Sequence, residues 1–314
     1  MHEETTVRGK RVWVAGHRGM VGSALVRRLA REGCEVLTVG RETCDLTDQA
    51  QSRAWIRDAR PDMVIVAAAR VGGILANMTY PVDFLRDNLL IETNVIEGAH
   101  AVGVEKLVFL GSSCIYPRDA AQPITEDALL TGPLEPTNQW YAIAKIAGIR
   151  LCQAYRQQYG SHFISAMPTN LYGPHDNFDL QSSHVIPALI RKAHRAKLAG
   201  ESGMEIWGTG TPCREFLHVD DMADATMFLL KHYDGAEHVN VGSGKDLPIA
   251  AVARIVMEVV GLEGDLRHDL TKPDGTLRKL MAADKLRGLG WSPSIGLRDG
   301  LAATYRWFLE NVES

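Results

Sequence analysis

The sequence predicts an α/β fold, in which a doubly wound parallel sheet carries helices on both faces and a smaller carboxy-terminal α/β lobe follows. Up to about Leu171, short apolar runs alternate with helical patterns, and such alternation builds a parallel sheet. After Leu171, Gly/Pro-rich segments such as Gly208–Pro212 and Lys272–Gly275 separate shorter elements. We therefore expect residues 1–171 to form the first domain and residues 172–314 to form mainly a second lobe.

Each expected strand is a short, mostly apolar run, and each expected helix has the longer spacing of a helical pattern. In chain order, the strands are expected at Val12–Ala15, Glu35–Val39, Met63–Val66, Lys106–Leu110 and Phe163–Met167, and the helices at Met20–Arg31, Thr47–Ala59, Pro81–Ala101 and Tyr141–Tyr159. Two later segments, Met204–Trp207 and Val239–Val241, also have the pattern of strands. We expect them to return to the sheet of the first domain.

The composition excludes several classes of protein. The chain has 314 residues, of which 46% are hydrophobic and 23% charged, as in ordinary globular proteins. Its net charge of -4 argues against nucleic-acid binding. No apolar run reaches the roughly 18 residues of a membrane span, and Met1–Thr6 lacks the apolar core of a signal peptide, so we expect a cytoplasmic protein. The scattered cysteines, without a Cys-x-x-Cys pair, indicate reduced thiols and no structural metal: Cys34, Cys44, Cys114, Cys152 and Cys213.

A glycine-rich turn joins the first expected strand to the first expected helix. Its glycines are Gly16, Gly19 and Gly22, in the spacing G-x-x-G-x-x-G. Glycines permit a tight turn and a close approach of backbone to a pyrophosphate, and the helix N-terminus offers free N–H groups and the positive end of a dipole. This pattern predicts a dinucleotide site of the Rossmann type.

The residues after the second strand decide between NADH and NADPH. A carboxylate there binds the ribose 2′-hydroxyl, whereas arginine suits a 2′-phosphate. Arg41 follows that strand, and Arg18 lies in the glycine turn. Both favour NADPH, provided that the neighbouring Glu42 side chain points away.

A second motif, Tyr141-Ala-Ile-Ala-Lys145, predicts proton transfer. The i, i+4 spacing puts both side chains on one face of a helix, so that the ammonium can lie near the phenol and near a cofactor ribose. A positive charge there lowers the pKa of the tyrosine. Upstream, a strand ends at Gly111-Ser-Ser-Cys114, where Ser112 or Ser113 can hydrogen-bond a substrate carbonyl or hydroxyl.

With these motifs in place, the chain resembles the extended short-chain dehydrogenase/reductase superfamily and, within it, the GDP-L-fucose synthase family. The resemblance covers nearly the whole chain. The strings that carry it are Ala15–Gly22, Val71–Ile74, Gly111–Pro117, Tyr141–Gly148, Met167–Asn177, Ser183–Pro187 and Arg214–Asp221.

The resemblance implies a bifunctional enzyme that converts GDP-4-keto-6-deoxy-D-mannose to GDP-L-fucose. Such enzymes invert C3 and C5 beside the sugar ketone and then reduce C4 with NADPH. Inversion beside a carbonyl needs a base and, on the opposite ring face, an acid. Cys114 and His184 match the family's pair, while Ser112, Tyr141 and Lys145 serve reduction. Which of Cys114 and His184 is the base at each carbon stays open.

The resemblance also implies binding residues. The cofactor is expected to contact the residues Gly16, His17, Arg18, Gly19, Met20, Val21, Gly22, Arg41, Leu46, Leu110, Gly111, Ser112, Ser113, Tyr141, Lys145, Pro168, Thr169, Asn170, Leu171 and His184. The GDP-sugar is expected to contact Lys192, Trp207, Arg214 and Asp274.

Relatives suggest a homodimer through the helices Pro81–Ala101 and Tyr141–Tyr159. Their residues Ile91, Val95, Ile146 and Ile149 would serve either that interface or the core of one protomer.

Two alternatives stay open. The first is a nucleotide-sugar 4-epimerase or 4,6-dehydratase of the same superfamily, although dehydratases usually place an acid/base carboxylate pair after the strand serine. Here Ser-Ser-Cys114 has no acidic residue after it until Asp119. The second is a non-catalytic dinucleotide sensor, a class that typically lacks the tyrosine or lysine that this chain has.

Overall fold

The computed structural model describes residues 4–180, 182–272 and 274–313. Met1–Glu3 of the amino-terminal segment and Pro273 of the Gly/Pro-rich segment lie outside the described residues. The main sheet has six strands in the order β2-β1-β3-β4-β5-β9, and every neighbouring pair is parallel. The strands are β1 (Arg11–Ala15), β2 (Glu35–Leu37), β3 (Met63–Val66), β4 (Lys106–Leu110), β5 (Phe163–Pro168) and β9 (Val239–Val241).

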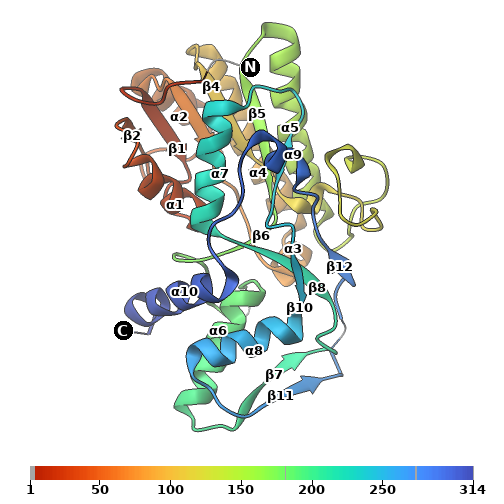
Figure 1. Cartoon of the computed structure of the whole chain (residues 1–314). Helices are drawn as coiled ribbons and strands as arrows, with labels where there is room; N and C mark the ends of the chain where they lie inside the picture. Colours follow the sequence, from red (N-terminus) through yellow and green to blue (C-terminus); the bar gives the residue numbers. More distant parts are fainter. Residues whose placement is uncertain (1–3, 181, 273, 314) are drawn as a thin grey trace.

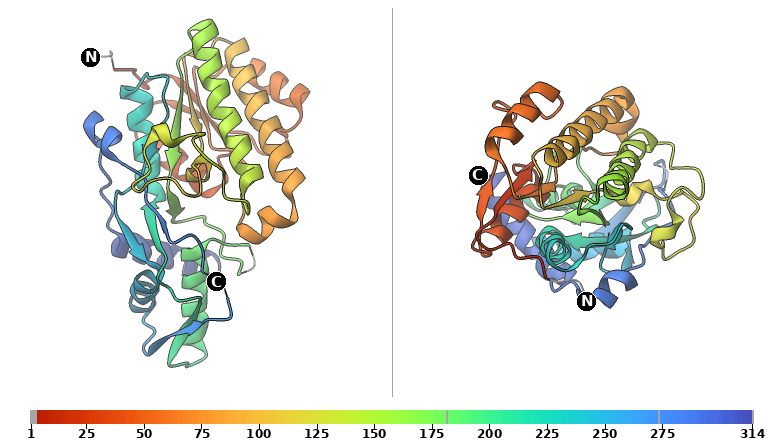
Figure 2. Two further views of the ribbon diagram at one scale, coloured as in Figure 1. Left: turned by 90° about the vertical axis from the view of Figure 1, so that its right-hand side faces the viewer. Right: turned by 90° about the horizontal axis from the view of Figure 1, so that it is seen from above.

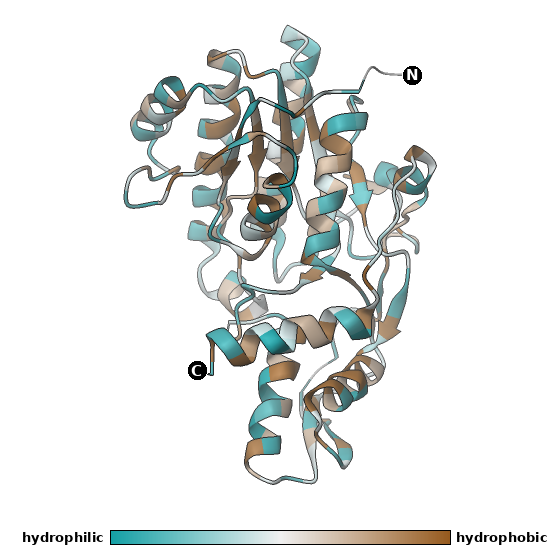
Figure 3. Cartoon of the chain, turned by 60° about the vertical axis from the view of Figure 1, so that its left-hand side comes forward, coloured by the Kyte–Doolittle hydropathy of each residue, from teal (hydrophilic) through white to brown (hydrophobic). Residues whose placement is uncertain are grey.

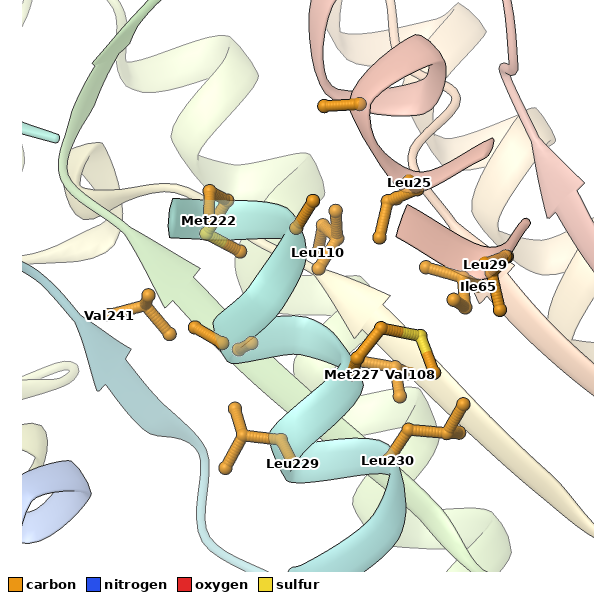
Figure 4. Packing of buried hydrophobic residues seen from close by; sticks show 14 of the residues in the cluster. Leu25, Leu29, Ile65, Val108, Leu110, Met222, Met227, Leu229, Leu230 and Val241 are labelled. Atoms are coloured by element: carbon orange, nitrogen blue, oxygen red, sulfur yellow. The ribbon is translucent and has the colours of Figure 1, made fainter. Parts of the chain in front are cut away.

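Helices cover both faces of this sheet, as the sequence predicts (Figure 1). On one face lie α1 (Met20–Leu29) and α7 (Val219–His232); on the other lie α2 (Gln49–Ala59), α4 (Pro81–Ala101) and α5 (Gln139–Tyr159). Figure 4 shows the first core, where Met222, Met227 and Leu230 of α7 pack against the strands and α1. The strands are almost entirely buried because both faces are covered.

The switch in strand order places a crevice at one edge of the sheet. From β1 the chain goes outward to β2, and it then returns to β3 on the other side of β1. Ligands in open α/β sheets bind outside the carboxyl ends of the strands at such a point. The connections that follow β1, β2, β4 and β5 all reach this edge, and they contain most of the predicted site residues.

The carboxy-terminal elements form a second body with its own core (Figures 1 and 3). Its helices are α6 (Val185–Leu198), α8 (Ile249–Val260) and α10 (Leu297–Asn311). A four-stranded mixed sheet links it to the first body and consists of β6 (Asn170–Tyr172), β8 (Cys213–His218), β10 (Asp246–Pro248) and β12 (Arg278–Lys279). Shorter elements complete the described chain: α3 (Ile74–Thr79), α9 (Asp284–Leu289) and the 3₁₀ turns η1 (Ser113–Ile115) and η2 (Glu126–Ala128).

Only one of the two late strands returns to the main sheet. Val239–Val241 pairs with β5 at the sheet edge, as expected. The expectation for Met204–Trp207 is wrong, since this segment belongs to β7 (Gly203–Trp207), which pairs in parallel with β11 (Asp265–Asp269) far from the main sheet. Its residues Met204 and Ile206 pack on the core of α6 and α8. The local pattern identifies a strand but not its partner.

Most element boundaries match the predictions, and those that differ do so by one or two residues. Helix α1 ends at Leu29 rather than Arg31, β2 ends at Leu37 rather than Val39, and α5 begins at Gln139 rather than Tyr141. Helix α4 has the predicted bounds. These differences lie at helix and strand ends, where the pattern of apolar residues carries least information.

Helices α4 and α5 lie side by side on the outer face of the sheet (Figure 2). Val95, Ile146 and Ile149 are buried within the protomer, and Ile91 lines a cavity described below. They therefore cannot supply an exposed apolar face. The exposed apolar side chains of these helices are others, including Leu90 and Ile143.

Across the described ranges, none of the helices combines the length and the apolar character needed to cross a bilayer.

Candidate active site

The glycine turn brings the backbone of α1 close to the end of β1. Gly16 adopts a positive φ of 87°, and a Cβ there would lie 2.6 Å from backbone atoms of Ala68. A Cβ on Gly22 would lie 2.0 Å from the Gly16 carbonyl oxygen. Gly19 differs, because its Cβ would have only one neighbour, at 3.6 Å. Gly16 and Gly22 thus close the turn, and Gly19 leaves open space before the helix N-terminus, where a pyrophosphate fits.

Two arginines stand where a 2′-phosphate is recognised, and both have carboxylate partners. Arg18 donates hydrogen bonds to Glu42, one of them from Nη1 to Oε2 at 2.8 Å, and Arg41 pairs with Asp45 at 3.1 Å. The expectation that Glu42 points away is therefore wrong. The loop after β2 folds back so that the Glu42 carboxylate lies over Gly40 and meets the Arg18 guanidinium. These side chains are exposed, so the pairs are weak and exchangeable.

A cavity of about 800 Å³ lies at the carboxyl edge of the main sheet. Every residue predicted to contact the cofactor lines it. It extends from the glycine turn and Arg41, past Ser112 and Tyr141, to His184 on the second body. The cavity therefore suits an extended dinucleotide whose pyrophosphate lies at α1 and whose reactive end lies near Tyr141.

Tyr141 and Lys145 both line this cavity from helix α5. Lys145 Nζ lies 5.8 Å from the centre of the Tyr141 ring, but its ion pair is with Glu92 of α4, at 3.0 Å. Burial raises the pKa of Tyr141 well above its usual range, and the nearby Cys114 and Glu92 add to this. The predicted lowering of the tyrosine pKa is thus not seen in the structure, because burial of the phenol dominates and the Lys145 ammonium is paired with Glu92.

The serine pair forms the turn that follows β4. Ser112 caps η1 by accepting a hydrogen bond from the Cys114 backbone N–H at 3.4 Å, and Ser113 is nearly buried. Both serines line the cavity. Cys114 lies just behind them and is 6% exposed, close enough to Tyr141 to raise the pKa of the phenol.

Lys279 of β12 stands beside Cys114 and was not predicted from the sequence. Burial raises the pKa of the Cys114 thiol, and the Lys279 charge opposes this rise. In return, exclusion of water lowers the pKa of Lys279, while Cys114 raises it. Burial dominates, so the Cys114 pKa is raised overall, and Lys279 reduces the cost of forming the thiolate, which is the form that removes a proton.

His184 approaches the cavity from the second body, at the N-cap of α6. The side chain is exposed along the cavity, but the surrounding protein partly shields the imidazole from water, and this lowers the His184 pKa below its usual value. The ring is therefore mainly neutral at pH 7, and it can accept a proton or donate one after protonation.

The residues predicted to hold the GDP-sugar fall into two groups. Arg214 lines the cavity beside Asn170 and donates hydrogen bonds to the carbonyls of Cys213 and Thr276. Exclusion of water lowers the pKa of Arg214.

Lys192, Trp207 and Asp274 lie farther out on the second body. Lys192 Nζ lies 5.3 Å from the centre of the exposed Trp207 ring, and Asp274 accepts hydrogen bonds from the N–H and hydroxyl of Thr209.

The structure adds two cations that the sequence reasoning missed. Lys272 lies 5.6 Å from the Trp207 ring, on the loop that carries Asp274, and Lys279 lies beside Cys114. Nothing local marks either lysine, because Lys272 lies 65 residues from Trp207 in sequence and Lys279 lies 165 residues from Cys114. The pairing of β11 with β7, which sets Asp269 opposite Trp207, brings Lys272 to that ring, and the pairing of β12 with β8 places Lys279.

Comparisons with known proteins agree with this geometry. The model of the NAD dependent epimerase/dehydratase family matches residues 12–242. The chain is 61% identical to a GDP-L-fucose synthase of Sinorhizobium fredii, with 97% of each chain covered. It is 51% identical to a GDP-L-fucose synthase of Escherichia coli, with 97% of this chain and 98% of the relative covered.

A solved structure of a GDP-L-fucose synthetase from Naegleria fowleri, bound to NADP, superposes with a TM-score of 0.92 at 28% identity and covers 100% of this chain and 98% of the other. The sequence match of the family model extends from β1 to β9 and so spans the whole main sheet. The chain belongs to the NAD dependent epimerase/dehydratase family.

Proposed function

We propose that this protein converts GDP-4-keto-6-deoxy-D-mannose to GDP-L-fucose, inverting C3 and C5 and then reducing the C4 ketone with NADPH. The observation that supports this most is that Tyr141 and His184 line one cavity from separate parts of the chain, while Cys114 lies just behind the serine turn that also lines it, near Tyr141. A reductase alone needs only the tyrosine. Two further proton carriers suit inversion beside a ketone.

The residues present fit NADPH. The glycine turn closes on itself and leaves space at Gly19, and the cavity volume of about 800 Å³ accommodates a dinucleotide. Arg18 and Arg41 would hold the 2′-phosphate in exchange for Glu42 and Asp45. Bound NADPH supplies the hydride for C4. Lys145 would contact the ribose, and Pro168–Leu171 would line the nicotinamide end.

For inversion, one proton carrier removes the α-proton at C3 or C5 and the other returns a proton on the opposite ring face. Cys114, beside Lys279, and His184, whose imidazole is mainly neutral, stand on different bodies of the protein. A hexose between them would present opposite faces to the two groups. Ser112 would donate a hydrogen bond to the C4 oxygen and stabilise the enolate.

For reduction, Tyr141 donates its phenolic proton to the C4 oxygen. Burial keeps the Tyr141 pKa high, so the phenol holds its proton throughout the neutral range. Arg214 would bind the pyrophosphate, and Lys192, Trp207 and Asp274 the nucleoside end. In this arrangement residues 1–171 mainly hold the cofactor and residues 172–314 mainly hold the sugar nucleotide.

We also propose a homodimer formed through α4 and α5 in the cytoplasm. Leu90 and Ile143 supply exposed apolar side chains on these helices, and all five cysteines are free thiols, which suits a reducing compartment. Light scattering on the purified protein measures the oligomeric state, and a monomer at working concentration would contradict the dimer.

The test of the activity uses purified protein, GDP-4-keto-6-deoxy-D-mannose and NADPH, with nicotinamide absorbance followed and the product identified by NMR. Stoichiometric loss of NADPH with formation of GDP-L-fucose supports the proposal. Turnover of another nucleotide sugar with no net change in cofactor would move the assignment to a 4-epimerase or 4,6-dehydratase. Cofactor binding without turnover of any nucleotide sugar would indicate a sensor.

A further inference from the structure

Glu92 lies directly behind the proposed proton-transfer pair, on the side away from the cavity. It projects from α4 toward α5, and its carboxylate is 3.0 Å from Lys145 Nζ. Both side chains are only 2% exposed. Helices α4 and α5 pack against one another here (Figure 2). The ion pair is thus sealed between two helices and the sheet.

The compartment is shaped for this carboxylate. Gly148 lies one turn after Lys145, and a Cβ there would stand 2.8 Å from a Glu92 oxygen and 2.3 Å from the Phe109 ring. Glycine thus leaves the space that the carboxylate fills. The Phe109 ring contacts the ammonium from β4, with its centre 4.6 Å from Lys145 Nζ. The lysine is held between an anion and an aromatic face.

The Glu92 carboxylate has little else to bind. Within the described ranges, neither of its oxygens receives a hydrogen bond apart from the ion pair with Lys145. Removing two charges from water often offsets the attraction between them, so a buried pair with few additional hydrogen bonds contributes little to stability. Stability alone therefore gives a poor account of Glu92. The partner that it does have, Lys145, points to the reaction centre.

We propose that Glu92 is a positioning residue for proton transfer, whose buried carboxylate fixes the Lys145 ammonium and limits the positive charge that reaches Tyr141. This inference rests on the proposed function. Without Glu92, the cluster would hold an unpaired cation beside the phenol. With it, the phenol keeps its proton until that proton is needed at the ketone oxygen.

The groups that face Glu92 fix the direction of the expected effect. Lys145, Tyr141 and Cys152 face it from α5, and Cys114 faces Tyr141 from the turn after β4. Burial raises the Glu92 pKa, and Lys145 opposes the rise. The Glu92 charge raises the pKa of Tyr141, so removing that charge should lower the pKa of the phenol.

The first experiment measures ketone reduction against pH for the holoenzyme. Reduction needs the protonated phenol, so activity falls on the alkaline side. Glu92→Gln keeps the shape of the side chain and removes its charge. We expect the alkaline limb, the part of the pH profile where activity falls as pH rises, to shift to lower pH by about one unit, which is the lower end of the pKa shift that a close charge causes. Glu97→Gln on the same helix is the matched control, because Glu97 pairs with the exposed Arg53 and should leave the limb unchanged.

The second experiment reads Tyr141 without substrate or cofactor. Tyrosinate absorbance is titrated in the protein and in Tyr141→Phe, and the difference isolates Tyr141. The same pair of titrations in the Glu92→Gln background should give a transition at lower pH. Because this measurement does not depend on turnover, it separates a failure of the present inference from a failure of the proposed function.

If Glu92→Gln does not fold, Glu92→Asp is measured in its place. The shorter carboxylate retreats from Lys145 but stays in the same compartment, so a smaller shift in the same direction is expected. The proposal is overturned if Glu92→Gln folds and both its alkaline limb and its Tyr141 transition equal those of the wild type. If Glu92→Gln is unfolded, the proposal is overturned when Glu92→Asp has the alkaline limb and Tyr141 transition of the wild type.

Discussion

Gly22 lies directly against Gly16, so that a Cβ on Gly22 would stand 2.0 Å from the Gly16 carbonyl oxygen. Two residues six positions apart thus hold the first turn of α1 against the end of β1. Backbone packed this closely cannot shift to make room. The dinucleotide end of the cavity therefore depends on this contact.

Gly19 and Gly22 have different surroundings, so the two positions should respond differently to substitution by alanine. Gly22→Ala must displace backbone, and we expect a loss of about 1–3 kcal/mol of stability, the usual range of overpacking. Gly19→Ala has space for its methyl group in the protein, so its stability should be close to the wild type, but the methyl would intrude on a pyrophosphate. Thermal unfolding and NADPH titration check both variants. Equal melting temperatures for the two would contradict the close contact.

Cys114→Ser should lose most epimerisation and keep NADPH binding, because the thiol lies behind the serine pair and does not line the cavity wall. The measurement is solvent-deuterium incorporation at C3 and C5 of the substrate by NMR. Cys152→Ser is the matched control, since Cys152 is buried on α5 and has no proposed part in the chemistry. Incorporation at the wild-type rate in Cys114→Ser would remove Cys114 from its role.

Tyr141→Phe should lower ketone reduction by about 10²–10⁴, the usual size of a general-acid contribution. The ring and its edge contact with Phe84 are kept, so folding and cofactor binding should hardly change. Single-turnover oxidation of NADPH measures the step. Tyr159→Phe, an exposed position at the end of the same helix, should react at the wild-type rate. Unchanged reduction in Tyr141→Phe would exclude the phenol as the proton donor.

Arg18→Gln should raise the Kd for NADPH by about tenfold, because one charge-assisted hydrogen bond contributes roughly 1.5–3 kcal/mol and part of that is already satisfied by Glu42. The Kd for NADH should change little. Glu42→Gln frees the guanidinium and should tighten NADPH binding. Fluorescence titration with each cofactor distinguishes these outcomes, with Arg57→Gln on the exposed face of α2 as the control. Equal weakening for both cofactors would argue against a 2′-phosphate contact.

Lys106 allows a prediction of stability away from the active site. It lies on β4, is 3% exposed, and its ammonium contacts the Thr5 hydroxyl at 3.3 Å. Burial lowers its pKa to about 8. The folded protein therefore binds this proton less tightly than the unfolded chain does, so burying Lys106 destabilises the fold below about pH 8 and this penalty fades as pH rises toward 10.5.

Lys106→Met should accordingly raise the free energy of unfolding at pH 7 by up to about 3 kcal/mol, and by less at higher pH, since one pKa unit corresponds to about 1.4 kcal/mol. Denaturant unfolding at several pH values measures the gain. Lys10→Met is the control, because the Lys10 ammonium bonds Glu105 and its loss should bring no gain. A gain for Lys106→Met that does not vary with pH would show that packing, and not charge, is responsible.

The sequence by itself determined the main sheet and the chemistry at its edge. Apolar runs that alternate with helical patterns identified five strands and the helices between them, because burial on both sheet faces requires continuous apolar strands. The glycine turn and Tyr141-Ala-Ile-Ala-Lys145 predicted residues that all line one cavity. Spacing within a single turn or helix fixes these relationships, so they can be predicted from local sequence.

The tertiary structure alone decided what distant segments contribute. It placed β7 beside β11 rather than in the main sheet, turned Lys145 toward Glu92, paired Arg18 with Glu42, and brought Lys279 to Cys114. Each relationship joins residues from separate elements. Strand partners and buried charge pairs are selected by the packing of the whole chain, and no local pattern of residues encodes that packing.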